Sequence, residues 1–124
     1  MGKCIGIRAG SVRLTGELND SPTACAIGAA LPLKAVARTW GDEIYFPIPV
    51  SCPLDQTAVE TVEVGDLGYW PAGKAFCIFF GPTPISRGEE IRPASAVNLI
   101  GKVLGDPAAF KEVQEGDPVE IDGE

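Results

Sequence analysis

Histidine is absent from this 124-residue chain. Imidazole is the commonest general base and metal ligand in proteins, and it activates the nucleophile in Ser-His and Cys-His pairs. Its absence excludes most familiar hydrolase mechanisms. The four cysteines are more than 20 residues apart, without a Cys-x-x-Cys pair, which argues against a zinc set. We therefore expect no metal site and no cofactor.

The chain also lacks long hydrophobic runs. Its first 30 residues contain no basic stretch followed by an apolar segment of the signal-peptide kind, and no run approaches the length of a membrane span. We expect a cytoplasmic protein with no membrane partner. In that compartment we expect four reduced cysteines that act as small buried apolar residues, namely Cys4, Cys25, Cys52 and Cys77.

Positive charge is scarce, with 10 Lys and Arg against 17 Asp and Glu and a net charge of −7. This sign disfavours nucleic acid as a partner. Residues 106–124 contain seven acids and one lysine, so this segment carries most of the net charge. It is interpreted as a solvated tail, with an acidic docking tail as the alternative. Alternation of Val119 and Ile121 with acids predicts an edge strand within it.

What the chain has is 45% hydrophobic residues, 15 glycines and 11 prolines. Short alternating runs between the glycines and prolines predict a mainly β fold in one domain, residues 1–124. The predicted strands are 3–8, 12–18, 34–40, 43–48, 59–64, 67–70, 75–80, 96–103 and the acidic edge strand. So many short strands favour a closed barrel, which leaves few exposed edges.

One short helix is expected between Pro22 and Pro32. Ser21 can cap its first turn, Pro22 suits the first helical position, and Pro32 limits its end. Its residues are small and apolar nearly all round, so we expect it to be buried at one end of the barrel.

The segment from Lys34 to Phe46 is the most informative part of the sequence. A two-residue turn at Gly41-Asp42 would pair four sets of residues across a hairpin, namely Trp40 with Glu43, Thr39 with Ile44, Arg38 with Tyr45, and Ala37 with Phe46. The pleat then gives one small apolar face for the barrel interior, formed by Ala35, Ala37, Thr39, Ile44, Phe46 and Ile48.

The opposite face of this hairpin carries Arg38, Trp40, Glu43 and Tyr45. Two aromatic rings, a guanidinium and a carboxylate have the composition of a recognition patch, because rings supply contact area and arginine supplies fixed donors. Tyr69 and Trp70 are candidates to lie nearby. The alternative is an ordinary surface ion pair between Arg38 and Glu43, with the rings covering their stems.

A second apolar run follows, in which Phe76, Ile78 and Phe80 alternate with Cys77 and Phe79. One set should fill the barrel, and the other should meet a second layer or a cleft.

Five segments together resemble the signature of a small prokaryotic family of uncharacterised proteins with an atypical cyclophilin-like fold. They are Leu31-Pro32-Leu33, Trp40-Gly41-Asp42-Glu43-Ile44-Tyr45-Phe46, Gly65-Asp66-Leu67-Gly68-Tyr69-Trp70-Pro71, Phe79-Phe80-Gly81-Pro82-Thr83-Pro84 and Ile100-Gly101-Lys102-Val103. The resemblance covers nearly the whole chain and implies an eight-stranded β-barrel of the cyclophilin type. It implies no established activity.

True cyclophilins, the peptidyl-prolyl isomerases, resemble this chain more faintly. Of their catalytic set, Arg38 is the one plausible counterpart, and there is no histidine. The leading hypothesis is a binding module that holds a peptide segment or a small molecule on Arg38, Trp40, Glu43 and Tyr45, with Tyr69 and Trp70 nearby. The alternatives are a weak prolyl isomerase with Arg38 as electrophilic donor, and a homodimer that uses the aromatic face as its interface.

Overall fold

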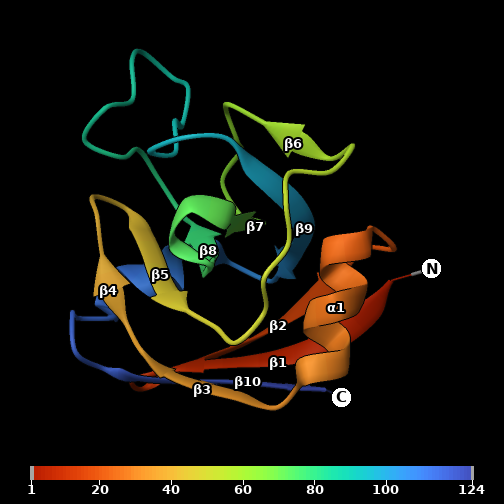
Figure 1. Cartoon of the computed structure of the whole chain (residues 1–124). Coiled ribbons are helices and arrows are strands. Elements are labelled where there is room, and N and C mark those ends of the chain that lie inside the picture. Colours follow the sequence, from red (N-terminus) through yellow and green to blue (C-terminus); the bar gives the residue numbers. More distant parts are fainter. Residues whose placement is uncertain (1, 124) are drawn as a thin grey trace.

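The structure is a computed structural model that describes residues 2–123, and these residues form one ten-stranded antiparallel sheet (Figure 1). One half of the sheet contains four strands, in the order β3 (Leu33–Val36), β10 (Pro118–Gly123), β1 (Lys3–Ala9) and β2 (Val12–Leu18). The other half continues from β2 with β9 (Val97–Leu104), β7 (Asp66–Trp70), β8 (Ala75–Phe79), β5 (Glu43–Pro47) and β4 (Arg38–Thr39). The short strand β6 (Ala58–Val59) pairs with β9 outside this order.

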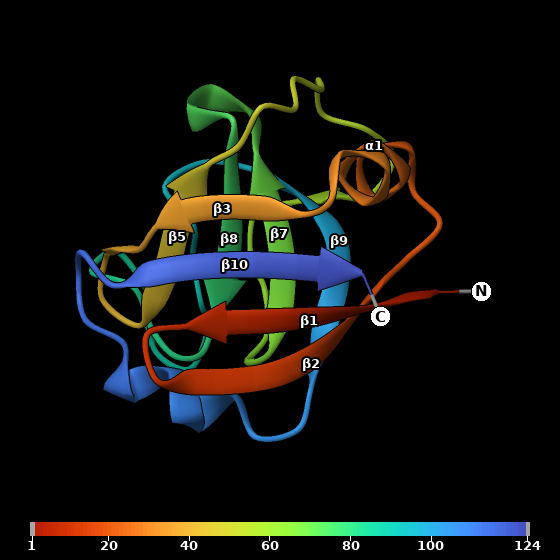
Figure 2. The ribbon, with the colours of Figure 1, turned by 90° about the horizontal axis from the view of Figure 1, so that it is seen from below.

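The two halves of the sheet face each other. Figure 2 shows β3, β10, β1 and β2 running across β5, β8, β7 and β9, as in an orthogonally packed pair of sheets. The main core fills the space between them, and its largest side chains include Phe46, Phe76, Phe110 and Tyr69. The rings of Phe46 and Phe76 stack with centroids 5.3 Å apart. The mainly β class with little helix is therefore confirmed.

The expected closed eight-stranded barrel was wrong, because hydrogen bonds do not close this sheet. Its two end strands, β3 and β4, are consecutive in the chain and do not pair with each other. Between them, the Ala37 N–H donates to Asp117 O, and Ala37 O accepts from the Gly116 N–H. The predicted strand 34–40 is therefore split at Ala37, which turns its backbone toward the segment before β10 instead of pairing with Phe46.

The helix α1 (Pro22–Ala30) forms where the sequence predicts it. The Ser21 side chain accepts the backbone N–H of Ala24 at 3.2 Å, as expected of its cap. Its buried residues are Thr23, Ala24 and Ile27, so the expectation of a buried helix holds for this face alone. The helix packs against β9 and β2 (Figure 1), which leaves its other side in solvent.

Two further predictions need correction. The strand predicted in the acidic segment forms, but it is not an edge strand, because β10 lies between β3 and β1 and pairs with both. All four cysteines are free as expected, but only Cys77 is buried, because the others lie at the molecular surface or near it. Two 3-10 turns were not predicted, η1 (Pro71–Gly73) and η2 (Pro107–Glu112), each of which begins with a proline.

A buried polar network ties α1 and the 52–57 segment to β9. Asn98 is fully buried, and its side-chain oxygen accepts the Asp55 N–H at 2.9 Å. Its amide nitrogen donates to Thr23 Oγ1 and to Pro53 O. The Thr23 hydroxyl in turn donates to the Asp55 carboxylate at 2.8 Å. These bonds satisfy groups that burial would otherwise leave unpaired.

Candidate functional site

A cavity of about 260 Å³ opens on the outer side of the sheet, under the loop of residues 80–96 that joins β8 to β9. Seven residues line it, namely Trp40, Glu43, Tyr45, Trp70, Pro93, Ala94 and Val97. The loop lies on the same side of the molecule as β4 and β5 (Figure 1). Three aromatic rings and one carboxyl group therefore surround a single concave space.

The hairpin between β4 and β5 places Trp40 and Glu43. Its register agrees with the prediction, with Arg38 opposite Tyr45 and Thr39 opposite Ile44, and the Trp40 N–H donates to Glu43 O at 3.0 Å. Gly41 adopts a φ of 62°, and a Cβ there would lie within 3 Å of Thr83 and Pro84 atoms. Glycine thus supplies both the left-handed turn and the close approach to the 80–96 loop.

The same hairpin is bonded to the loop that covers the cavity. The Asp42 N–H donates to Pro82 O at 2.9 Å, and the Phe80 N–H donates to Asp42 O at 3.0 Å. Within the loop, the buried Thr83 hydroxyl donates to Arg92 O. These bonds hold the wall that carries Pro93 against the wall that carries Trp40 and Glu43.

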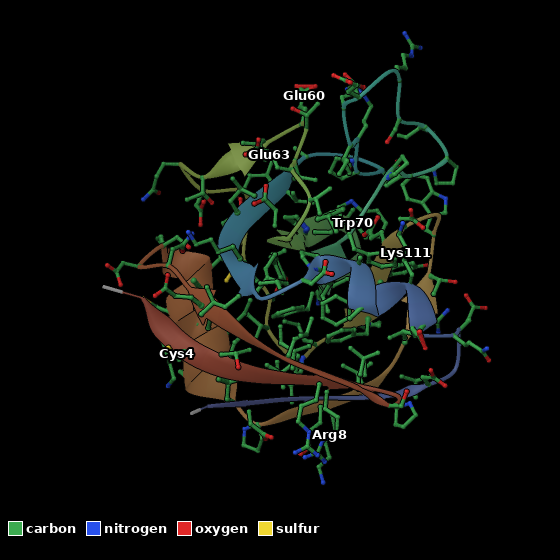
Figure 3. The ribbon with its side chains drawn as sticks, turned by 180° about the vertical axis from the view of Figure 1, so that it is seen from behind. Cys4, Arg8, Glu60, Glu63, Trp70 and Lys111 are labelled. Atoms are coloured by element: carbon green, nitrogen blue, oxygen red, sulfur yellow. The ribbon has the colours of Figure 1, made fainter. Side chains whose placement is uncertain are left out.

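Trp70 and Tyr45 form two further walls. Their rings meet edge to face, with centroids 6.5 Å apart and an interplanar angle of 85°. The indole N–H of Trp70, a residue labelled in Figure 3, donates to Ser95 Oγ at 2.6 Å, which ties the ring to the loop. A Cβ on Gly73 would lie 2.6 Å from two carbons of the Trp70 ring, so this glycine is needed for the ring to rest on the η1 turn.

Glu43 is the one charged residue in the cavity lining, and only 5% of it is exposed. Burial raises the pKa of its carboxyl to about 7, and the hydrogen bond with the Cys77 thiol lowers it only in part. Burial, first of all, and the adjoining Glu43 carboxylate raise the pKa of the Cys77 thiol. The thiol is therefore a neutral neighbour of an acid that titrates near neutral pH.

Beneath the cavity lies a second, smaller cluster of buried apolar side chains. It includes Cys77, Phe79 and Val97, with Tyr45 and Trp70 packed against it. Phe76, Ile78 and Phe80 belong to the main core instead. The predicted alternation along this strand is confirmed, because one set fills the space between the sheet halves and the other lies under the outer layer.

The structure brings together four of the six predicted site residues, namely Trp40, Glu43, Tyr45 and Trp70. Arg38 is exposed beside Tyr45 and is not part of the cavity lining. Among residues 2–123 it forms no ion pair with Glu43, since the ion pairs found there are Lys34 with Glu120 and Arg92 with Glu90. The isomerase and homodimer hypotheses stay predictions.

Tyr69 lies on the other side of the sheet from the cavity. Its side chain is fully buried in the main core, because alternation along β7 points it away from Trp70. The phenol donates to Val50 O at 2.6 Å and accepts the Cys52 N–H at 3.3 Å. Tyr69 is therefore a structural residue that holds the 50–52 segment.

We expect Tyr69→Phe to lower the free energy of unfolding by about 1–3 kcal/mol, because Val50 O and the Cys52 N–H would each lose a buried partner. Urea denaturation of the variant and the parent measures this difference. Ligand affinity of the folded variant should be unchanged. A large loss of affinity without a loss of stability would instead put the phenol in the site.

Sequence reasoning missed three residues that complete the cavity, namely Pro93 and Ala94 in the 80–96 loop and Val97 at the start of β9. Val97 lies in a predicted strand, but nothing in the alternation of that strand indicates what covers its outer face. Pro93 and Ala94 carry no chemical signal of their own. The described part of the chain contains no group of three or more His, Cys, Asp or Glu side chains that could hold a metal ion. No helix in residues 2–123 is both long and apolar enough to span a membrane.

The chain belongs to the cyclophilin-like family, whose model matches residues 3–122. A hypothetical protein from Archaeoglobus fulgidus, known from its solution structure, is 42% identical, with a TM-score of 0.82 over 98% of this chain and 94% of that chain. The resemblance to an uncharacterised prokaryotic family is confirmed.

A more distant structure shares the fold alone. McbB, solved in complex with tryptophan, is 14% identical, with a TM-score of 0.67. The alignment covers 95% of this chain and 44% of McbB. No curated protein matches the sequence.

Proposed function

We propose that this protein is a binding module and that its ligand occupies the cavity formed by Trp40, Tyr45, Trp70 and Glu43. The observation that carries the proposal is the convergence of three rings on one buried carboxyl group in a concave space. Binding sites are typically apolar hollows with a few polar groups that fix the orientation of the ligand. A buried acid with a perturbed pKa in such a hollow is a further sign of function.

The size of the cavity selects the kind of ligand. At about 260 Å³ it lies just below the range of about 300–1,000 Å³ that is usual for drug-sized ligands. It suits a small molecule or one side chain of a peptide, since a longer peptide would lie outside it. Hydrogen bonds join the hairpin and Trp70 to the 80–96 loop, which supports a cavity of fixed shape.

The experiment is a fragment screen by nitrogen-15 NMR, with cationic, anionic and neutral fragments. Trp40 and Trp70 are the two tryptophans of the chain, and both line the cavity, so the two indole N–H signals report on this site. McbB was solved with tryptophan, so tryptophan and indole belong in the panel.

We expect at least one fragment to shift both indole signals in a saturable way, and Trp40→Ala to weaken its binding about tenfold or more, as expected when an aromatic anchor is removed. Glu89→Gln, an exposed loop change, serves as the control and should keep the affinity. Fragments that bind only elsewhere, leaving both indole signals unmoved, would refute the proposed site.

A further inference from the structure

Resting on the proposed function, we propose that the cavity receives a small organic ammonium cation, held by the faces of Trp40, Tyr45 and Trp70 and by the carboxylate of Glu43. Three features of the molecule support this ligand class, namely the aromatic rings of the cavity, the charge in its lining and the surroundings of Glu43.

The walls have the composition that binds ammonium groups. The face of an aromatic ring carries negative electrostatic potential and attracts a cation within about 6 Å of its centroid, most strongly for tryptophan. Two indoles and a phenol line this cavity. The edge-to-face contact of Tyr45 and Trp70, at 85°, sets these two walls at nearly a right angle. Such walls enclose a round methylated ammonium better than a flat ring.

The cavity lining carries one negative charge, on Glu43, and no positive charge to balance it. Glu43 is buried, and no lysine or arginine is among the lining residues. A buried carboxylate with no positive charge beside it is unfavourable, and a cation placed against it removes much of that penalty. A bound anion would be repelled, and a metal ion would find only one ligand group. An organic cation satisfies both the rings and the acid.

The elements packed around Glu43 supply no competing charge. From β8 the titratable neighbour is the Cys77 thiol, which stays neutral. From β4, Arg38 lies outside the lining, and Asp42 in the turn is not part of it. Strands β7 and β9 contribute Trp70 and Val97.

The 80–96 loop carries four charged side chains, which are Arg87, Glu89, Glu90 and Arg92. Arg92 is already paired with Glu90 at 2.8 Å. None of the four lines the cavity. A cationic ligand would therefore meet no competing positive charge from this loop at Glu43.

The test compares choline with dimethylbutanol, its neutral analogue in which carbon replaces the quaternary nitrogen. Tryptophan fluorescence and the indole signals of the intact protein measure both affinities. At about pH 8 we expect choline to bind at least roughly tenfold more tightly. At about pH 6, one unit below the pKa of Glu43, we expect choline affinity to fall about tenfold while dimethylbutanol affinity stays level.

Two variants that each remove one carboxylate distinguish the effect of the Glu43 carboxylate on choline binding from the effect of the net charge of the protein. Glu43→Gln should remove the pH dependence of choline affinity and lower the preference for choline to what the rings alone provide, whereas Glu89→Gln should keep both as in the parent. Equal binding of the two ligands, or binding of other fragments but not choline, would overturn the cation proposal and leave the cavity as a binding site. Failure of every fragment in the panel would overturn both proposals.

Discussion

Glu43→Gln is expected to make the ligand-free protein more stable than the parent above neutral pH. Only 5% of this residue is exposed to solvent, and the pKa of its carboxyl rises from 4.5 to about 7 on folding. Above pH 7 the folded protein must hold a buried negative charge. Glutamine keeps the shape and an oxygen for the Cys77 thiol without that charge.

The size and the pH range of this effect follow from proton linkage. Below pH 4.5 Glu43 is protonated in both the folded and the unfolded chain, and it adds no pH dependence. Between pH 4.5 and about 7 the unfolded chain ionises first, so stability of the parent falls by about 1.4 kcal/mol per pH unit. The total is about 3 kcal/mol, and it levels off above the folded pKa.

Urea denaturation of the parent and of Glu43→Gln across this pH range measures the difference directly. Glu89→Gln provides the control, because Glu89 is exposed. Other titrating groups are common to both proteins and cancel in the comparison. A difference in unfolding free energy that stays constant with pH would contradict the burial of an uncompensated acid.

Asn98→Leu is expected to lower the free energy of unfolding by about 2–5 kcal/mol, a large loss for a single substitution. Leucine has a similar shape, but it leaves the Asp55 N–H and Pro53 O without their partners. Thr23 also loses one of its two side-chain bonds. Because these bonds join α1 and the 52–57 segment to β9, the segment should loosen as well.

Denaturation and amide hydrogen exchange together check this prediction, and the Asp55 amide should exchange faster in the variant. Asn19→Ala is the comparison, since Asn19 is only half-buried and its amide nitrogen donates to Leu99 O at 2.9 Å. A loss of stability no larger for Asn98→Leu than for Asn19→Ala would mean that the network contributes little to the fold.

Much of the strand and helix pattern was predictable because local rules decide it. The Gly41-Asp42 turn dictated the pairing of Arg38 with Tyr45 and hence which side chains share a face. The Ser21 cap and Pro22 likewise located the start of α1. That the sheet stays open between β3 and β4 was not predictable, because the backbone groups of Ala37 bond to Gly116 and Asp117, which are far from it in the sequence.

The candidate site was predictable in part for the same reason. Trp40, Glu43 and Tyr45 share a face of one hairpin, so a local pattern brings them together. The enclosed surroundings of Glu43 could not be foreseen, because the cavity that it lines is completed by Pro93 and Ala94, about 50 residues further along the chain. The prediction that Tyr69 lies near the site was wrong, because a tyrosine side chain is compatible with both a binding surface and a buried core, and here it is buried in the main core.

The most direct test of the proposed site is the titration of the Glu43 carboxyl carbon by carbon-13 NMR in the ligand-free protein. We expect a midpoint near pH 7, because the acid is buried among rings without a cation beside it. A midpoint near 4.5, the ordinary value for glutamate, would show that water or a cation reaches the carboxyl, and it would contradict a cavity built around a buried, uncompensated acid.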